Sequence, residues 1–264
     1  MRLTVIGCSG SFPGPDSPAS CYLVEAEGFR LLMDLGPGGL SGVQRHIRLD
    51  QIDAVCISHL HSDHCLDLCG LSVARLIRPQ GPMPPLPVHG PDRTQLRLAW
   101  ALTADPVGGG QPSGTGGDGR FTDAFRFVTI TPGVREIGPL RVTTALMNHP
   151  VQTFGFRVEH AGRSLAYSAD TGQTQALVDL ARDADVLLCE ASFLEPPAGA
   201  PALPEGLHLT ARQAGQHAAR AGAGHLVLTH LVPWNDTGRT LDEASEDFPG
   251  PVSLAFSGLE LTLE

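Results

Sequence analysis

Membrane-crossing and export signals are missing from this sequence of 264 residues. No apolar stretch is long enough to span a bilayer, which argues against a transmembrane anchor within these residues. Residues 1–7 already have a strand-like pattern, without the apolar core or the small-residue cleavage site of a signal peptide. We therefore expect a protein that has no membrane partner and works in the cytoplasm.

Paired cysteines and an excess of positive charge are missing as well. The 6 cysteines are scattered, without the Cys-x-x-Cys spacing of a zinc ribbon, and a chain of this size needs no disulfide scaffold. We interpret them as small buried apolar residues. The net charge of −10 argues against a broad nucleic-acid-binding face, because such a face neutralises phosphates with Lys and Arg. A small anionic substrate bound through metal ions stays compatible with this charge.

The sequence is rich in strand-forming segments, which alternate with helical patterns. Hydrophobic residues make up 42%, so we expect a packed core and a single domain spanning residues 1–264. Strands are expected at 3–6, 21–25, 31–34, 54–58, 86–89, 125–130, 140–147, 154–159, 164–169, 186–190, 226–229 and 252–262. Helices are expected at 69–77, 94–102, 177–184, 211–221 and 241–247, and loops at 106–120 and 195–206.

Two successive strand-and-helix halves predict an α/β fold. The arrangement compatible with them is a four-layer αββα sandwich, in which two mixed sheets pack together and helices cover the outside. Periodicity alone does not fix this topology, so the prediction depends on the motif at residues 59–64.

The segment 59–64 concentrates metal-binding side chains at the end of a predicted strand. His59, His61, Asp63 and His64 offer imidazole nitrogen and carboxylate oxygen, which suit divalent zinc, manganese or iron. Alternation along an extended segment aims His59 and His61 at one point, and the turn can aim Asp63 and His64 at a second. A polar loop with chance histidines is the alternative, which the density of ligands disfavours.

This segment resembles the H-x-H-x-D-H signature of the metallo-β-lactamase superfamily. Residues 148–150, 168–172 and 228–230 resemble its third, fourth and fifth motifs. The resemblance implies the metallo-β-lactamase fold and two divalent metal ions, zinc in the first place, with manganese or iron as alternatives. The implied ligands are His59, His61 and His149 for one ion, Asp63, His64 and His230 for the other, and Asp170 as the bridge between them.

The resemblance also implies a hydrolytic mechanism. Two adjacent metal ions can share a water and lower its pKa, so a metal-bridging hydroxide is the expected nucleophile. Asp170 argues against antibiotic hydrolysis, because many β-lactamases of the superfamily have Cys at this position.

Several further residues are candidates for catalysis or substrate binding. His208 lies in a segment that resembles the H-x-T motif of phosphodiesterase members, where it would donate a proton to the leaving group or bind phosphate; a helix-capping histidine is the alternative. Glu190, in a segment similar to E-A-[ST], could orient a histidine, or it could be a structural carboxylate. Asp63 joins these two as a catalytic candidate. Ser9 and Ser11 follow the first strand and could bind an anion, although such residues also form simple turns.

The substrate prediction depends on the branch of the superfamily. Residues 14–20, 63–68 and 165–168 resemble a branch related to the tRNA-processing ribonuclease Z, which includes cyclic-nucleotide phosphodiesterases. We therefore expect a phosphodiesterase for a small substrate such as cAMP. Ribonuclease Z itself is the first alternative, although the arm that grips tRNA has no counterpart between His149 and Asp170. A thioesterase or lactonase is the second alternative, and a non-catalytic metal-binding protein the third. Relatives often form homodimers, so a homodimer is also expected.

Overall fold

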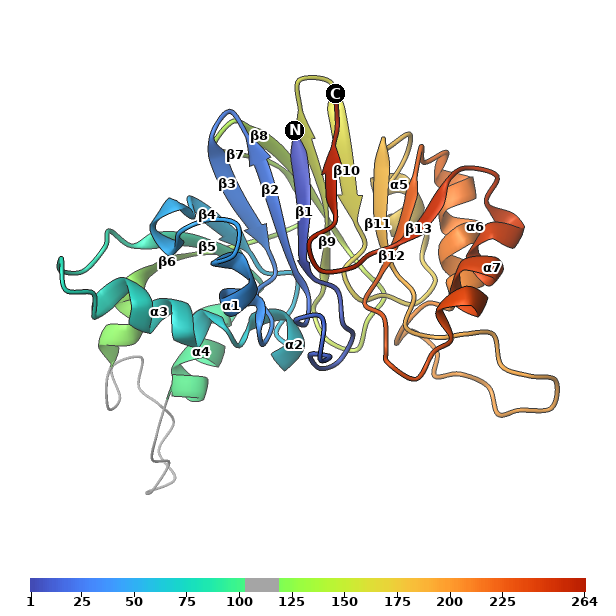
Figure 1. The fold of residues 1–264 in the computed structure, drawn as a ribbon, viewed down its shortest axis with the longest axis horizontal. Coiled ribbons are helices and arrows are strands. Elements are labelled where there is room, and N and C mark those ends of the chain that lie inside the picture. The colour runs from blue at the N-terminus through green and yellow to red at the C-terminus, as the bar shows by residue number, and fades with distance from the viewer. Residues whose placement is uncertain (103–118) are drawn as a thin grey trace.

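Two seven-stranded sheets pack face to face in the computed structural model, which describes residues 1–102 and 119–264 (Figure 1). The first sheet has the order β14-β1-β2-β3-β4-β5-β6, and the second has the order β13-β12-β11-β10-β9-β8-β7. Strands β3 to β6 run parallel to one another, as do strands β10 to β13, and the remaining pairings are antiparallel. Both sheets are therefore mixed, as predicted.

The strands of the first sheet are β1 (Arg2–Gly7), β2 (Cys21–Ala26), β3 (Phe29–Met33), β4 (Ala54–Cys56), β5 (Leu86–Gly90), β6 (Phe125–Thr129) and β14 (Glu260–Thr262). Those of the second are β7 (Gly133–Ile137), β8 (Leu140–Leu146), β9 (Phe154–His160), β10 (Arg163–Tyr167), β11 (Val186–Glu190), β12 (Leu226–Thr229) and β13 (Val252–Leu254). The central strands are nearly continuous apolar runs because both of their faces are covered.

Helices cover the outer face of each sheet (Figure 1). The first half of the described chain contributes α1 (Gly39–Val43), α2 (Ser62–Cys65), α3 (Leu68–Leu76) and α4 (Thr94–Leu102), with 3-10 turns at Leu49–Gln51 and Gly119–Ala124. The second half contributes α5 (Gln175–Leu180), α6 (Ala211–Ala221) and α7 (Thr237–Asp247). The predicted capping box begins α6, since the Thr210 side chain accepts a hydrogen bond from the Gln213 amide and the Gln213 side chain accepts one from the Thr210 amide.

Three groups of buried side chains hold these layers together. One fills the space between the sheets and includes Val5, Tyr22, Phe156 and Leu188. A second joins the first sheet to α3 and α4, and a third joins the second sheet to α5, α6 and α7. The narrow alanine stripe of α6 lies in this third group, where small side chains allow the helix to approach the sheet closely. The four-layer αββα sandwich predicted from the sequence is confirmed.

Some predicted boundaries were wrong, each for a local reason. The expected strand 252–262 is two strands in different sheets, because residues 255–259 turn and Gly258 has φ 92°. Strand β7 was not predicted, since it is an edge strand and only its last residue is buried. The helix expected at 177–184 ends at Leu180. The expected loop 106–120 lies almost entirely outside the described residues.

Two sequence interpretations concern cysteines and membranes. All 6 cysteines are free thiols, and all except Cys69 are buried, which confirms the interpretation of the other five. In the part of the chain that the structure describes, no helix combines the length and apolar character needed to cross a membrane.

Candidate metal centre

The end of β4 carries four of the predicted ligands. β4 is buried, pairs in parallel with both neighbours and ends at Cys56. The chain stays extended at His61 (φ −65°, ψ 153°), immediately before the short helix α2. His59 and His61 therefore leave the strand end on an extended segment, whereas Asp63 and His64 lie on the first turn of α2.

The other three predicted ligands come from strand ends of the second sheet. His149 follows β8, Asp170 follows β10 and His230 follows β12. These residues are far apart in the sequence, yet the packing of the sheets brings them to the segment that follows β4. The potential ligand atoms form two groups, each within 4.8 Å: His59, His61, His149 and Asp170 in one, and Asp63, His64, Asp170 and His230 in the other.

The group that contains His59 is partly open to solvent. His59 Nε2 lies 3.0 Å from His61 Nδ1, and His149 Nε2 lies 3.3 Å from the same His61 atom. Asp170 Oδ2 lies 3.6 Å from His59 Nε2. His59 and Asp170 are buried, whereas His61 and His149 are half-buried. Three ring nitrogens thus converge on one point beside a carboxylate.

The group that contains His64 is enclosed on all sides. His64 Nε2 lies 3.3 Å from His230 Nε2 and 3.2 Å from Asp170 Oδ1. Asp63 Oδ2 lies 3.2 Å from His230 Nε2. All four side chains are buried. Because Asp170 belongs to both groups, one oxygen faces each, which is the arrangement expected of a bridging carboxylate.

Two rings of the centre are held from behind by a single carboxylate, Asp34. His64 Nδ1 donates to Asp34 Oδ2 at 2.8 Å, since the carboxylate can only accept. Ser58 Oγ donates to the same oxygen at 2.8 Å, so its bond with His59 Nδ1 at 3.0 Å is donated by the ring. Each Nδ1 is thus engaged outside the centre, and each Nε2 faces into the centre, where it can bind a metal ion when it carries no proton.

The rings of the second sheet are anchored in the same way. His149 Nδ1 donates to the Leu207 carbonyl at 2.8 Å. Ser192 Oγ donates to Glu190 Oε2 at 2.8 Å and accepts from His230 Nδ1 at 2.7 Å. The Nε2 atoms of His149 and His230 are therefore also left as lone-pair donors toward the centre.

The donor atoms fit divalent metal ions. Asp170 Oδ1 is buried without a hydrogen-bond partner, which is costly in a folded protein unless a cation neutralises it. Burial alone would raise the pKa of Asp170, but His230, His64 and His59 outweigh it and hold the pKa well below its usual range. Burial lowers the pKa of His59 well below its ordinary value, which keeps that ring neutral. Neutral imidazoles and an ionised carboxylate are the forms that bind zinc, manganese or iron.

Several residues around the centre have uncommon backbone conformations. Asp34 (φ 58°), Ala169 (φ 50°) and His230 (φ 54°) all adopt the left-handed conformation, which is uncommon for residues other than glycine. Ser11 does the same with φ 65°. Such conformations persist only where the surrounding contacts enforce them, and they cluster at functional sites.

Asp34 was not identified from the sequence. It is fully buried and accepts hydrogen bonds from the Ser58 amide at 2.7 Å and from Tyr167 Oη at 2.8 Å, in addition to Ser58 Oγ and His64. The sequence offers one signal, an aspartate that ends the apolar run 31–34, but the run was interpreted as strand. Ser192 was missed for a similar reason, because only the fold brings its hydroxyl between Glu190 and His230.

His208 and Glu190 form a pair beside both ligand groups. His208 Nδ1 donates to Glu190 Oε1 at 3.0 Å, and the His208 ring lies 5.6 Å from His149 and 5.2 Å from His230 between ring centroids. Burial alone would lower the pKa of His208, but Glu190 outweighs it, with help from Asp170 and Asp63, and raises the pKa above its ordinary value. The opposite nitrogen, Nε2, has no hydrogen-bond partner within the described ranges.

The two serines predicted to bind substrate lie in different environments. The Ser9 hydroxyl donates to the Ser17 carbonyl at 3.1 Å and accepts from the Gly14 amide at 3.3 Å, so it is engaged within its own loop. Ser11 is exposed, and its amide donates to Asp63 Oδ2 at 2.9 Å. Ser11 therefore touches a candidate metal ligand, and Ser9 does not.

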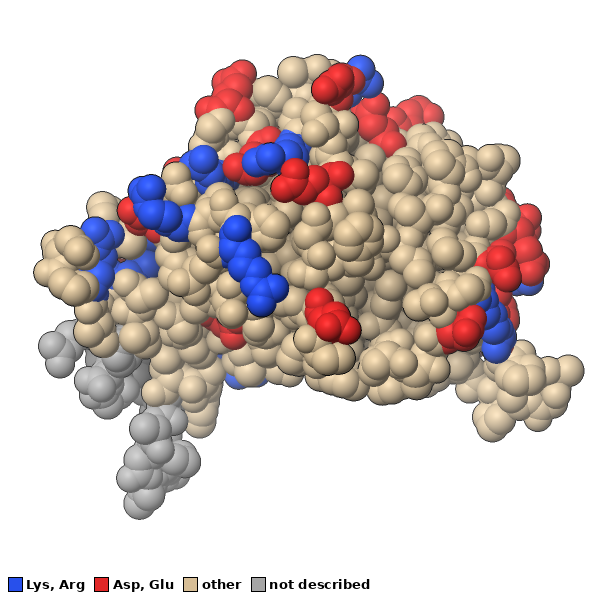
Figure 2. All heavy atoms as spheres, in the orientation of Figure 1, with Lys and Arg blue, Asp and Glu red and all other residues tan. Residues whose placement is uncertain are grey.

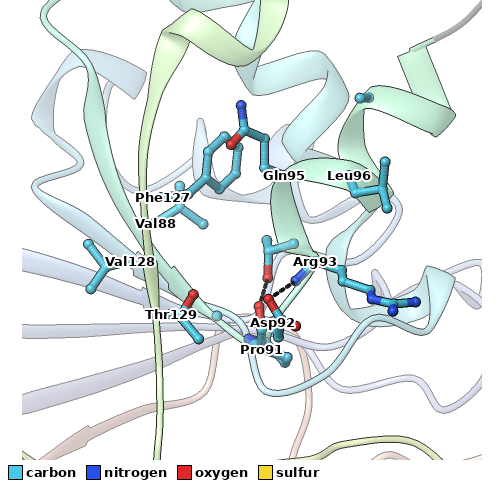
Figure 3. A pocket seen from close by; sticks show the side chains of 12 residues that line it. Val88, Pro91, Asp92, Arg93, Gln95, Leu96, Phe127, Val128 and Thr129 are labelled. Carbon is cyan, nitrogen blue, oxygen red and sulfur yellow. Dashed lines mark hydrogen bonds between the residues drawn. The ribbon is translucent and has the colours of Figure 1, made fainter. Parts of the chain in front are cut away.

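Two cavities of substantial volume are formed by the described residues. One, of about 280 Å³, is lined by His208 together with Asn148, Gln173, Glu205 and Gln213. The other, of about 440 Å³, lies between β5, β6 and the start of α4, with Val88, Phe127 and Thr129 on its strands (Figure 3). None of the seven candidate ligands lines the larger cavity, whereas the smaller one meets the centre at His208.

Comparison with known proteins shows relatives along almost the whole chain. Residues 30–231 match the beta-lactamase superfamily domain. An uncharacterized protein of Mycobacterium leprae (strain TN), ML1173, is 42% identical over 260 residues, which cover 98% of this chain and 87% of that protein. Ribonuclease Z of Mycolicibacterium gilvum (strain PYR-GCK) is 30% identical over 262 residues, which cover 94% of this chain and 87% of that protein.

Solved structures show the same architecture. The crystal structure of the metallo-beta-lactamase fold protein YhfI from Bacillus subtilis superposes with a TM-score of 0.81 at 28% identity, and the match covers 98% of both chains. The similarity therefore extends to both sheets and to all four segments that contribute to the two ligand groups.

Proposed function

The chain belongs to the metallo-β-lactamase superfamily and is a metallo-hydrolase, and on this premise we propose that it is a phosphodiesterase for a small substrate such as a cyclic nucleotide. We propose His59, His61 and His149 as ligands of one divalent metal ion and Asp63, His64 and His230 as ligands of the other, with Asp170 shared. Zinc is the metal we propose, with manganese or iron as alternatives, because these ions accept the same nitrogen and oxygen donors.

The observation that carries the proposal is the His208–Glu190 pair beside the two ligand groups. Divalent cations at such a centre polarise a phosphoryl oxygen and lower the pKa of water. Cleavage of a phosphodiester also requires a proton for the departing alkoxide oxygen. His208 is held at Nδ1 by Glu190 and has Nε2 available, so the protonated ring can donate from Nε2 to that oxygen. Glu190 then stabilises and orients the ring, which makes it a positioning residue.

Asp63 and Ser11 support the same reaction from the other side of the centre. The Asp63 carboxylate accepts the Ser11 amide at one oxygen, which fixes the side chain while it faces His230. We propose Asp63 as a ligand that also orients the attacking water, and Ser11 as the residue whose exposed hydroxyl contacts substrate. For Ser9 the contacts support a role in shaping the loop.

Ribonuclease Z activity is the second candidate, because a relative of that name is 30% identical. Two features favour the smaller substrate. Only β9, β10 and short connections separate His149 from Asp170, so the described chain has no arm there to grip tRNA. On the face seen in Figure 2, acidic and basic side chains are interspersed and no broad basic field appears. Phosphate backbones bind chiefly through such basic surfaces.

The remaining properties are proposed on narrower grounds. Free thiols at all 6 cysteines are typical of a reducing compartment and support the cytoplasm. The apolar group shared by both sheets supports one domain over residues 1–264. We also propose that the protein forms a homodimer. The exposed side chains of Val73 and Ile77, near the end of α3, offer apolar surface for such an interface.

A substrate panel tests the reaction. Protein loaded with Mn²⁺ or Zn²⁺ is assayed with cAMP, bis-p-nitrophenyl phosphate, a precursor tRNA and a thioester, and its metal content is measured in parallel. We expect turnover of the first two compounds. Asp170→Ala should lower that turnover more than about 100-fold, whereas His46→Ala, which removes an exposed histidine, should leave it unchanged. Turnover of the thioester alone, or unchanged activity of Asp170→Ala, would contradict the proposal.

A further inference from the structure

Two aromatic side chains are exposed together beside the metal centre. Phe12 is 43% exposed and Trp234 is 69% exposed, and their ring centroids lie 5.9 Å apart at an interplanar angle of 39°. Single exposed apolar residues are common on protein surfaces and need no explanation. A tryptophan and a phenylalanine far apart in the sequence, exposed side by side, form an apolar aromatic surface that is open to solvent, most of all at the indole.

The backbone around Phe12 is attached directly to the ligand groups. Ser11, the preceding residue, donates its amide to Asp63 Oδ2 at 2.9 Å. Gly10 approaches His230 so closely that a side-chain carbon at this position would lie 2.8 Å from the Nδ1 atom of that ring. Phe12 therefore directly follows a residue that contacts a candidate metal ligand, so its backbone lies close to the centre.

The segment that carries Trp234 is fixed to the same place. The Leu231 amide donates to the Cys8 carbonyl at 2.9 Å, which joins the residue after His230 to the loop that leads to Phe12. On the other side of the indole, the Asn235 side chain donates to the Ser192 carbonyl at 3.0 Å. Ser192 in turn holds His230, so both flanks of Trp234 are tied to the ligand group that contains His64.

The remaining surroundings of the centre have a different character. Besides His208, the side chains that line the 280 Å³ cavity are the amides of Asn148, Gln173 and Gln213, the Glu205 carboxylate, and Leu203 and Pro204, with no Phe, Tyr, Trp or Arg among its described residues. A phosphodiester at the metal centre would therefore have an aromatic surface on the Asp63 side and hydrogen-bonding groups on the His208 side. Nucleotides combine these two chemistries, since a planar base is joined to a polar sugar and phosphate in one molecule.

We propose that Phe12 and Trp234 form a stacking surface for the base of a nucleotide substrate, an inference that rests on the proposed phosphodiesterase function. Stacking on an aromatic ring tolerates every base, because each base has a π-face, and it strengthens with the area of overlap. The surface should therefore favour purine over pyrimidine nucleotides and should discriminate little between adenine and guanine. Sugar and phosphate selection would be left to the polar cavity and the metal centre.

Tryptophan fluorescence tests binding without metal or turnover. The chain has two tryptophans, so Trp100→Phe, a conservative change on the exposed face of α4, leaves Trp234 as the single reporter. With metal-free Trp100→Phe protein, AMP should quench the emission saturably and ribose 5-phosphate should not. The matched variant Trp234→Phe retains Trp100 and should show no saturable quenching by AMP. Equal quenching in both variants, or none in either, would overturn the proposal.

Steady-state kinetics test the role of the base. Trp234→Ala should raise KM for cAMP about 10-fold with kcat changed less than about twofold, and Phe12→Ala should act in the same direction but less strongly. Hydrolysis of the corresponding ribose cyclic phosphate without a base should not change, and the preference for cAMP over the cyclic cytidine nucleotide should shrink.

Failure of the two proposals can be told apart. If the unmodified protein hydrolyses neither cyclic compound but AMP still quenches Trp234, the phosphodiesterase proposal fails and the stacking surface stands. If Trp234→Ala impairs both compounds equally, or if sedimentation shows that it dissociates a dimer, the aromatic surface has another role and the stacking proposal is overturned.

Discussion

The two ligand groups of the candidate centre differ in how deeply the fold encloses them. His61 and His149 are half-buried, whereas Asp63, His64 and His230 are all buried. Both groups span the two sheets, since His59 and His64 follow β4 of the first sheet, whereas Asp170, which belongs to both groups, follows β10 of the second. The groups therefore differ in burial and not in the sheets that they join, and we expect the enclosed group to contribute more to stability and the open group to be the more accessible to solvent.

Anchoring contacts show the same difference. In the enclosed group, His64 is held by the Asp34 carboxylate, and His230 is held through Ser192 by Glu190. In the open group, His59 is held through Ser58 by Asp34, and His149 is held by a neutral carbonyl. Hydrogen bonds to charged groups are roughly twice as strong as neutral ones, so His64, which contacts a carboxylate directly, has the strongest anchor of these four rings.

The two ligand groups should differ most in how much stability an alanine substitution in each of them costs. Both His64→Ala and His61→Ala remove a proposed ligand and should lower turnover more than about 100-fold. In the metal-free protein, burial would lower the pKa of His64, but Asp170 and Asp34 outweigh it and raise the pKa well above its ordinary value. His64→Ala therefore leaves buried carboxylates without their positive partner and should cost about 3–5 kcal/mol of stability, whereas His61→Ala should cost little.

Denaturant unfolding of the metal-free proteins measures this difference, with His46→Ala as the control for loss of an exposed histidine. Equal losses of stability in the His64 and His61 variants would contradict the prediction. Burial of a ligand group would then not determine how much that group stabilises the fold.

His208 should separate chemistry from metal binding. His208→Ala should lower turnover of cAMP about 100-fold, because the departing alkoxide needs a proton. Turnover of bis-p-nitrophenyl phosphate should fall far less, since p-nitrophenolate is a stable leaving group, and metal content should stay unchanged. Equal losses with both substrates would show that His208 acts on binding or on the metal centre and not as a proton donor.

Asp34→Asn tests the anchoring of one ring in each group with almost no change in shape. The amide cannot accept from Ser58, Tyr167 and His64 as the carboxylate does, so the rings of His64 and His59 lose their common support. We expect metal affinity to fall about 10- to 100-fold. Ser192→Ala provides the matched change behind His230. Titration with zinc in a competing chelator measures both, and an unchanged affinity in both variants would contradict the role given to the outer contacts.

The smallest expected effect is on the pH dependence of stability, and it comes from His217, a buried histidine outside the two ligand groups. Burial lowers its pKa below the ordinary value of 6.5, and its Nε2 accepts from the Thr174 amide at 3.2 Å. Its contribution to stability is therefore complete above pH 6.5 and is lost as the pH falls below that value. Relative to His217→Gln, the natural protein should lose up to about 1.4 kcal/mol per pH unit in this window, independently of added zinc. Zinc dependence of the difference would assign the effect to the metal centre.

The first half of the centre could be predicted because it is dense in the sequence. Four ligands fall in six consecutive positions after a buried strand, so local geometry alone brings them together. The ligands of the second sheet were found only through resemblance, since His149, Asp170 and His230 each stand alone at a strand end. Their meeting point is a property of sheet packing, which no local pattern encodes.

The outer contacts and the edges of the fold escaped prediction for physical reasons. Asp34 belongs to an apolar run, and nothing local distinguishes a buried anchoring carboxylate from the last residue of a strand. Strand β7 lies at a sheet edge, where exposed side chains break the buried pattern. The last predicted strand is divided because its two ends pair with different sheets, and strand propensity is the same for both.

That division has a consequence for folding. β14 completes the outer edge of β1, so the pairing of β1 is finished only when it meets residues 260–262, which are far from it in the sequence. The loop that follows β1 is the one that contacts Asp63 and approaches His230. Because pairings between distant parts of a chain form late in folding, we expect this side of the candidate centre to be completed late as well.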